Sequence, residues 1–227
     1  PYYSTLPQGS FINEPCGCYY FNGAAYAALG FIVVSLNLPG SPLRDKVFQD
    51  VGYGSIPSCN AFKDRISALK QLAKRYPSMD IDHVGIVGSD YITGAVYGLL
   101  EHPEFYNVGV NVGFDDSRFG MASIVEMYEG VKPPERPYTD ELVASLEGKL
   151  LLMHGLRDLA APPETTFHLA DALQKAYKNF DMVIEPNGIH IVTSYQLCRT
   201  WDYLVENLLH EVPPQSFNLT TSYDKTL

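Results

Sequence analysis

The sequence predicts an α/β protein built on a doubly wound, mostly parallel β-sheet with helices on both faces. Three observations lead to this prediction. Short, continuous apolar runs recur along the chain, which is the pattern of strands buried on both faces. Segments with helical periodicity separate these runs, as in strand–helix–strand crossovers. With 227 residues and 46% hydrophobic residues, the chain is long enough and apolar enough for one sizeable core.

The elements of the N-terminal half follow from local patterns. Gly30 stops a short alanine-rich helix, the continuous apolar run after it reads as a buried strand, and Pro77 closes a longer amphipathic helix. Gly40 and the prolines around it mark a connection. The predicted order is a core strand in the first residues, a helix over 24–30, a strand over 31–36, an irregular connection over 43–57, a helix over 61–75 and a strand from 84.

The C-terminal half continues the alternation. Pro133, Pro134 and Pro137 interrupt a segment without strand signals, which suits a lid-like excursion at one edge of the sheet. Pro162 and Pro163 suit a helix start. The predicted order is a helix over 92–101, a strand over 108–112, a helical excursion over 114–148, a strand over 149–153, a helix to about 178, a strand over 180–185 and an amphipathic helix over about 193–210. We expect one domain over 1–212 and a loose polar tail over 213–227.

Composition narrows the classes of ligand and partner. The formal net charge is −10 and no basic stripe occurs, so nucleic acid is not an expected partner. No apolar run approaches the roughly 18 residues of a membrane span. Cys16 and Cys18 form a C-x-C pair, which without a second cluster is a weak metal or disulfide signal. We therefore expect no metal and no cofactor. Because the first residues already look like core strand, we also expect that an upstream segment has been removed.

The stretch from Val84 to Gly94 joins an apolar strand run, a sharp-turn signal and the start of an apolar helix. A nucleophile elbow of the type G-x-S-x-G has this layout, and it raises one side chain at the carboxyl end of the sheet. In this chain that side chain belongs to Asp90. Asp158 and His190 also follow predicted strands, so all three are expected at the same edge. Their order along the chain is the nucleophile, acid, histidine order of the α/β hydrolases.

The sequence resembles the catalytic domain of the prolyl oligopeptidase and dipeptidyl peptidase IV family of serine peptidases. The resemblance covers about residues 1–215 and is carried by five stretches: 30–34 (GFIVV), 48–54 (FQDVGYG), 75–77 (RYP), 80–86 (DIDHVGI) and 148–155 (GKLLLMHG). It implies an α/β-hydrolase fold and a serine hydrolase domain that normally follows a β-propeller. It also slightly favours a secreted or extracytoplasmic location. Expected partners are a β-propeller domain or chain, a small-molecule or peptide ligand, and a second copy in a homodimer.

Family roles map onto individual positions. Asp158 matches the triad acid and His190 the triad histidine. The nucleophile position is Asp90, where the family has serine, and the next backbone N–H, that of Tyr91, would help to bind an oxyanion. Tyr2 matches the oxyanion tyrosine of the dipeptidyl peptidases. An aspartate has no proton for a histidine base to remove, so peptidase activity by the family mechanism is not expected.

Two interpretations of Asp90 then remain open. It could be a nucleophile that attacks saturated carbon, with His190 and Asp158 activating the hydrolytic water on a small ester, epoxide or halide. Alternatively, two carboxylates could raise the pKa of His190 above about 6.5 and turn the triad into a buried ion network. Ile92 and Ile191 stand where the family has glycine and crowd the site, which favours the second interpretation, a pseudo-hydrolase for binding, scaffolding or redirected chemistry. A non-hydrolytic small-molecule enzyme is a third class, because fold does not fix function.

A few conspicuous side chains are expected to be structural. His154 ends a predicted strand and is expected to have its hydrogen bonds satisfied in the core. Trp201 lies on the last predicted helix, where it is expected to pack. The other histidines are scattered, and we expect them at the surface: His83, His102, His168 and His210.

Overall fold

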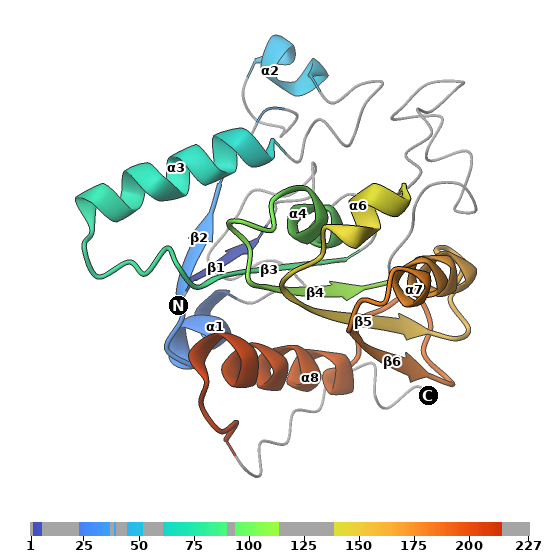
Figure 1. Cartoon of the computed structure of the whole chain (residues 1–227). Coiled ribbons are helices and arrows are strands. Elements are labelled where there is room, and N and C mark those ends of the chain that lie inside the picture. The colour runs from blue at the N-terminus through green and yellow to red at the C-terminus, as the bar shows by residue number, and fades with distance from the viewer. Residues whose placement is uncertain are drawn as a thin grey trace.

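The computed structural model describes residues 2–5, 23–36, 39, 45–51, 61–89, 94–113 and 139–214. Strands and helices alternate along these residues, so the predicted α/β class is confirmed (Figure 1). The elements are β1 (Tyr2–Thr5), α1 (Gly23–Ala28), β2 (Ile32–Ser35), α2 (Lys46–Asp50), α3 (Phe62–Arg75), β3 (Val84–Ser89), α4 (Ala95–Glu101), β4 (Val108–Val112), α6 (Asp140–Ala144), β5 (Lys149–Gly155), α7 (Glu164–Lys175), β6 (Asp181–Glu185), α8 (Ser194–Leu204) and the π-helical turn η2 (Val205–Leu209).

The described strands form one sheet in the order β2-β1-β3-β4-β5-β6, and every neighbouring pair is parallel. The register pairs Gly88 of β3 with Asn111 of β4, and Asn111 with Leu152 of β5. Since all strands point the same way, the carboxyl ends of β3, β5 and β6 lie along one edge. Ligands of doubly wound sheets bind beyond that edge.

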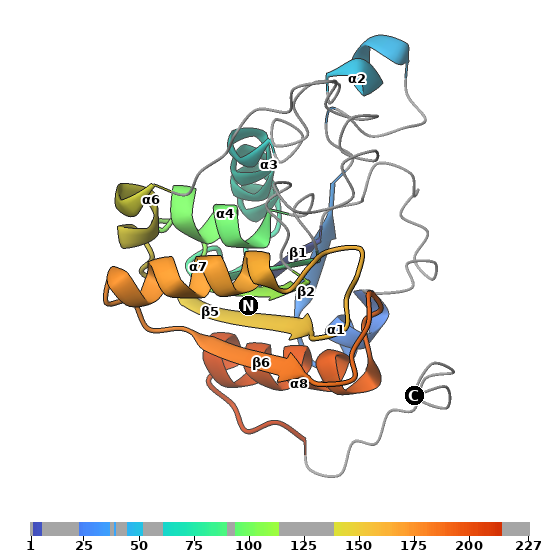
Figure 2. The same cartoon turned by 90° about the vertical axis from the view of Figure 1, so that its right-hand side faces the viewer.

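Helices cover both faces of the sheet, and successive side chains of each strand alternate between the faces. Leu150 and Leu152 of β5 pack in one core cluster with α3, α4, α6 and α7, whereas Leu151 and Met153 pack in a second cluster with α1 and α8. Figure 1 shows α3, α4 and α6 above the sheet and α1 and α8 below it, and Figure 2 shows α7 on the α4 side. Burial on both faces explains why the strands are continuous apolar runs.

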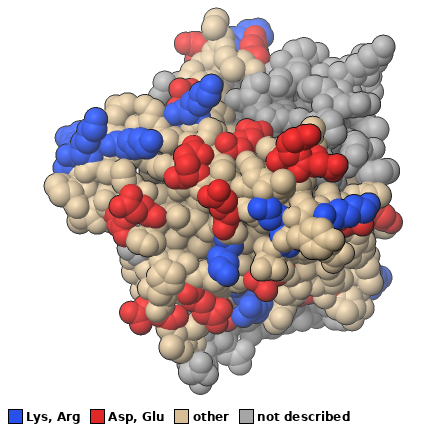
Figure 3. Space-filling view, in the orientation of Figure 1, with Lys and Arg blue, Asp and Glu red and all other residues tan. Residues whose placement is uncertain are grey.

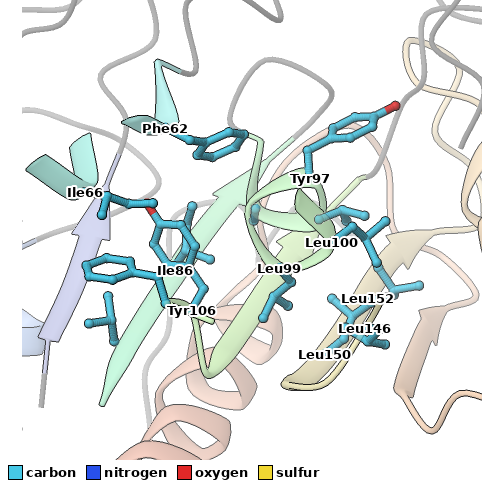
Figure 4. Packing of buried hydrophobic residues seen from close by; sticks show 14 of the residues in the cluster. Phe62, Ile66, Ile86, Tyr97, Leu99, Leu100, Tyr106, Leu146, Leu150 and Leu152 are labelled. Atoms are coloured by element: carbon cyan, nitrogen blue, oxygen red, sulfur yellow. The ribbon is translucent and has the colours of Figure 1, made fainter. Parts of the chain in front are cut away.

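Helix α4 is fixed closely on the sheet. Its residues from Ala95 to Leu100 are all buried. A Cβ atom on Gly109 of β4 would lie 2.2 Å from Leu99 Cδ1, so the absence of a side chain there lets α4 approach the sheet. Figure 4 shows Leu99, Leu100 and Leu152 among the side chains of this cluster. Each fully buried leucine contributes about 2 kcal/mol to the stability of the fold. Helix α4, which comes shortly after Asp90 in the chain, therefore has a rigid support.

Several predicted elements agree closely with the structure. The strand predicted over 108–112 has the bounds of β4, and the helix predicted over 61–75 begins one residue later as α3. The short helix ends before Gly30, whose φ of 99° confirms the predicted glycine stop. The strand predicted to begin at Val84 does so, as β3.

The prediction that 43–57 is irregular throughout was wrong, because α2 lies within it. Asp45 Oδ1 accepts a hydrogen bond from the Phe48 backbone N–H at 2.8 Å, which satisfies one of the N–H groups left open at a helix start. Lys46 and Asp50 form an exposed ion pair at 2.5 Å, one turn apart. Asp45 is a common N-cap residue type, but the prolines and glycines of this segment favour an irregular connection.

Helix α7 ends at Lys175, three residues before the predicted end. Tyr177 has a φ of 54°, in the left-handed region. The N–H of Tyr177 bonds to the carbonyl of Gln174 at 3.0 Å, and the N–H of Lys178 to that of Leu173 at 2.9 Å. This pair of bonds is a Schellman motif, which usually has glycine at the left-handed position. With tyrosine there, the sequence lacked the usual stop signal.

Two other helix bounds also differ from the prediction. The helix predicted over 92–101 is helical from Ala95, because Gly94 has a φ of 66° and cannot be part of the helix. The last helix, predicted as one α-helix over about 193–210, passes into the π-helical η2 at Val205.

Some predictions fall outside the described residues. These are the positions of Asp90 and Tyr91, the lid segment over 114–138 and the tail from 215. The part of the excursion that is described contains α6, capped by Thr139 Oγ1, which accepts from the Leu142 N–H at 3.2 Å. Within the described ranges, no helix is long and apolar enough to cross a membrane.

Candidate active site

Asp158 lies in the loop that follows β5, at the carboxyl edge of the sheet. Its side chain is 3% exposed. Oδ1 accepts hydrogen bonds from the backbone N–H groups of Ala160 at 2.9 Å and Ala161 at 2.8 Å. Oδ2 lies 2.8 Å from Nδ1 of His190. The loop therefore holds the carboxylate by two backbone donors and aims its second oxygen at the imidazole.

His190 lies in the loop after β6, and this loop is joined to the Asp158 loop. The Leu156 N–H bonds to the carbonyl of Glu185 at 2.9 Å, and the Arg157 N–H bonds to the carbonyl of Gly188 at 2.9 Å. These two bonds continue the pairing of β5 and β6 beyond the sheet. They place Asp158 opposite His190, although the two residues are far apart in sequence.

Two glycines allow the loops to come this close. A Cβ atom on Gly155 would lie 2.5 Å from the carbonyl carbon of Gly188, and one on Gly188 would lie 2.8 Å from Cα of Gly155. Any side chain at either position would collide with backbone. The contact between the two loops thus depends on glycine at both positions.

The far end of the histidine loop is also fixed. Thr193 Oγ1 donates a hydrogen bond to Glu185 Oε1 at 2.8 Å, so residues at the start and the end of the loop are linked. Thr193 is also the N-cap of α8, in a capping box with Gln196. The loop that carries His190 is therefore held by β6 on one side and by the first turn of α8 on the other.

The electrostatics of the pair favour an ionised Asp158. Burial alone would raise the pKa of this carboxyl, but hydrogen bonds from His190 and from the N–H groups of Ala161 and Ala160 hold the pKa below its usual range. The His190 side chain is 44% exposed. With Nδ1 facing the carboxylate, a base at this position would act through Nε2. The geometry suits an acid that orients a histidine.

His154, at the end of β5, is fully buried beside this pair. Its Nδ1 lies 2.7 Å from Thr166 Oγ1 and its Nε2 lies 2.8 Å from the carbonyl oxygen of Ala161. Burial lowers its pKa, so the ring is neutral and Nε2–H donates to the carbonyl. Since Ala161 also donates to Asp158, His154 supports the acid loop. The prediction of a structural histidine is confirmed.

The other sequence-predicted site residues are not all brought together. Asp90 directly follows β3, whose last residue is Ser89, and its placement and that of Tyr91 lie outside the described residues. The register pairs Tyr2 of β1 with Val84, the first residue of β3. Tyr2 therefore starts its strand at the amino edge of the sheet, whereas Asp158 follows β5 at the carboxyl edge, and the oxyanion role of Tyr2 stays a prediction.

Sequence reasoning missed the residues that position the pair. Glu185 and Thr193 were not singled out, although Thr193 and Gln196 have the T-x-x-Q spacing of a capping box. Gly155 and Gly188 lie far apart in the sequence. Their mutual contact has no local signal, because it depends on how β5 and β6 pair.

No metal-binding arrangement is seen in the part of the chain that the structure describes: no group of three or more His, Cys, Asp or Glu side chains could hold an ion there.

The histidines expected at the surface are exposed in three cases, His83, His168 and His210, while His102 is partly buried. Figure 3 shows basic side chains gathered at the outer end of α3, which includes Lys74 and Arg75, and acidic side chains spread across the same face.

Comparison with known proteins decides the family. The model of the prolyl oligopeptidase family matches residues 19–210, most of the chain. The chain belongs to the prolyl oligopeptidase family. Its resemblance to that family, inferred from the sequence motifs, is confirmed. Among curated relatives, human dipeptidyl peptidase 8 is 26% identical over 221 residues, which cover 89% of this chain and 24% of that protein. Dipeptidyl peptidase family member 1 of Caenorhabditis elegans is 29% identical over 161 residues, 68% of this chain and 20% of that protein.

Solved structures of this family show the same fold. Dipeptidyl peptidase 4 of Porphyromonas gingivalis superposes with a TM-score of 0.75 and 22% identity, over 92% of this chain and 31% of that one. The acylaminoacyl peptidase of Pyrococcus horikoshii superposes with a TM-score of 0.73 and 16% identity, over 99% of this chain and 38% of that one. The predicted α/β-hydrolase fold is thus confirmed. The chain spans about a quarter of the length of the curated relatives and a third of the solved chains.

Proposed function

We propose that this prolyl oligopeptidase family domain has lost acyl-serine peptidase chemistry and acts as a pseudo-hydrolase in binding, scaffolding or redirected chemistry. The observation that carries the proposal is Asp90, the residue that follows β3, where the family resemblance expects the nucleophilic serine. A serine nucleophile gives its proton to the histidine as it attacks. An ionised aspartate has no such proton, so the first step of the family mechanism cannot occur.

The retained acid–histidine pair supports a change of role for His190. Asp158 is ionised and lies 2.8 Å from Nδ1. A second carboxylate, that of Asp90, near the same ring would favour the imidazolium further. A protonated histidine cannot accept a proton from a nucleophile or from water. In this proposal the former triad is an ion network that stabilises the carboxyl edge of the sheet.

Hydrolysis assays test this proposal. The names of the relatives point to dipeptide p-nitroanilides and N-acyl aminoacyl p-nitroanilides as substrates, and p-nitrophenyl esters extend the test to more reactive bonds. We expect no turnover above that of His190→Ala, and we expect Asp90→Ser to recover some ester hydrolysis if only the nucleophile was lost. Turnover by the wild type that disappears in His190→Ala would contradict the proposal.

A second function is favoured by the intact geometry of the pair, which is what a hydrolase using Asp90 as its nucleophile would need. Asp90 would attack a carbon atom and displace a halide or an epoxide oxygen, forming an ester. His190 Nε2 would take a proton from water, and the resulting hydroxide would attack the carbonyl carbon of that ester. The alcohol product would keep the original carboxylate oxygen, and one water oxygen would remain on Asp90.

That oxygen balance provides a decisive experiment for the alternative. A single turnover of a haloalkane or epoxide in water labelled with a heavy oxygen isotope would place the label on Asp90, which peptide mass spectrometry detects. Asp90→Asn and His190→Ala are the matched variants. If neither turnover nor label is found, the pseudo-hydrolase proposal stands. If Asp90 carries the label, Asp90 is the nucleophile of a hydrolase.

We also propose that this domain works together with a β-propeller. The chain covers 24% of human dipeptidyl peptidase 8, and the family resemblance implies a β-propeller, as a further domain or a separate chain, that controls access to the site. Purification of the native protein followed by mass spectrometry would reveal such a segment. A native protein with no propeller in the same chain or complex would overturn this part.

A further inference from the structure

A cavity of about 640 Å³ lies between α1 and the end of α8, away from the Asp158–His190 pair. Its walls come from α1, from α8 with η2, and from the segment Val212–Pro214. Figures 1 and 2 both show α1 beside α8 on the same side of the sheet. The volume lies within the range of small-molecule sites, about 300–1,000 Å³. No role in the proposed hydrolase chemistry accounts for it.

One wall of the cavity is apolar and aromatic. It is lined by Ala25 of α1, by Leu29, which directly follows α1, and by Trp201 of α8. The indole of Trp201 meets the ring of the buried Tyr26 edge to face, with centroids 6.2 Å apart and an interplanar angle of 88°. Packing against Tyr26 holds the indole in one orientation. The expectation that Trp201 packs is therefore met, but the same side chain also lines a cavity.

The rim of the cavity is acidic. Asp202 and Glu206 are one turn apart and both line it, and Glu206 is exposed. Arg199 Nη1 forms an ion pair with Asp202 Oδ2 at 3.7 Å, a partly exposed contact that is longer than a charged hydrogen bond and weakens the charge of Asp202 only in part. Among the described residues that line the cavity there is no lysine, arginine or histidine. The rim therefore presents two carboxylates beside the face of an apolar pocket.

We propose that this cavity binds a small organic ammonium ion, an amine or quaternary ammonium group carried on an apolar body. The ammonium group is attracted by the two carboxylates and by the indole ring. The apolar body fills the space between α1 and α8 and removes apolar surface from water. An anion of the same shape is repelled by Asp202 and Glu206, so charge decides between otherwise similar ligands.

The experiment uses a series of three probes that differ mainly in charge: phenethylammonium, 2-phenylethanol and phenylacetate. Trp201 is the only tryptophan of the chain, so its fluorescence reports directly on the cavity. We expect phenethylammonium to bind about tenfold more tightly than the alcohol, from one cation–π contact and exposed ion pairs, and phenylacetate not to bind. High salt should weaken the binding of the ammonium probe.

Variants assign the effect to named side chains. Asp202→Asn combined with Glu206→Gln should weaken phenethylammonium binding about fivefold, because the cation–π contact remains, and leave the alcohol unchanged. Asp171→Asn, an exposed aspartate of α7 paired with Lys175, is the matched control and should change nothing. Ala25→Phe should block both phenethylammonium and 2-phenylethanol by filling the cavity. Cys198 also lines the cavity, so protection of its thiol from alkylation measures binding independently of fluorescence.

Three results would overturn the proposal. The first is equal affinity for the charged and neutral probes. The second is the absence of both a fluorescence change and thiol protection at millimolar phenethylammonium. The third is a concentration-dependent dimer, detected by sedimentation velocity, whose formation alone changes the Trp201 signal, because a second copy would then cover the cavity. None of these results depends on whether the protein has hydrolase activity.

Discussion

Replacing Gly155 by alanine tests whether the glycine contact positions the Asp158–His190 pair. The new Cβ would lie 2.5 Å from the carbonyl carbon of Gly188. Two carbon atoms need about 3.5 Å, so the loops would have to separate by about 1 Å. The two backbone hydrogen bonds between the loops, each 2.9 Å long, would then exceed the usual limit of about 3.2 Å.

The expected cost follows from these distances. Each of the two lost hydrogen bonds costs about 0.5–1.5 kcal/mol and the crowding costs about 1–3 kcal/mol, which together give about 2–6 kcal/mol in the free energy of unfolding. Urea denaturation measures this cost. Proton NMR follows the His190 Nδ1–H that faces Asp158, and this signal should weaken or shift. The control is Gly23→Ala, whose Cβ would make an ordinary contact of 3.4 Å with Val33 Cγ1.

A small effect would refute this account. If Gly155→Ala and Gly23→Ala both stay within about 0.5 kcal/mol of the wild type, the close approach is not a constraint on the fold. An unchanged His190 signal in a clearly destabilised Gly155→Ala variant would show that the glycine contact stabilises the loops without positioning the pair.

Three further predictions concern the same edge of the sheet. Asp158→Asn should lower the free energy of unfolding by about 1–3 kcal/mol at pH 7. Because the folded pKa of Asp158 is lowered, this loss should disappear as the pH falls below about 4. Urea denaturation at pH 7 and at pH 3 measures the loss, and an equal loss at both pH values would contradict the prediction. Buried His154 has a lowered pKa, so below pH 6.5 the unfolded chain binds a proton more readily than the folded one, and the free energy of unfolding should fall by up to about 1.4 kcal/mol per pH unit. His154→Gln should lack this part of the fall. Parallel pH profiles of the two proteins would refute the prediction. Thr193→Ala removes a helix cap and the bond to Glu185, so we expect a loss of about 1–2 kcal/mol by thermal unfolding, against no loss if the cap is unimportant.

The acid and the histidine could be predicted because their positions follow from local patterns and one topological rule. Each residue comes shortly after an apolar run of strand length, and the carboxyl ends of parallel strands share an edge. Asp158 and His190 therefore had to lie near one another once the sheet was parallel. The distance of 2.8 Å between them required the structure, because it depends on the joined loops.

Features that depend on long-range pairing could not be predicted in this way. Tyr2 matches an oxyanion tyrosine by motif, but the motif does not give the register of β1 with β3, which pairs Tyr2 with Val84. The contact between Gly155 and Gly188 likewise arises only when β5 and β6 pair. A motif gives residue types and their order, whereas strand register decides which of them meet.

Local exceptions explain the remaining errors. Tyr177 adopts a left-handed conformation that normally favours glycine, so the end of α7 had no sequence signal. The start of α2 did have one, since Asp45 caps it, but a single cap beside several prolines is a weak predictor of a helix.

The most direct test of the central claim is covalent labelling with a fluorophosphonate probe, followed by intact-mass measurement and peptide mapping. Such a probe reacts with the activated serine of a serine hydrolase, and an active serine peptidase serves as the control. If acyl-serine chemistry has been lost at Asp90, the wild-type protein should gain no mass while the control is fully labelled. An adduct on Ser89, the residue that precedes Asp90 and ends β3, would show a shifted but working nucleophile and would contradict the proposal.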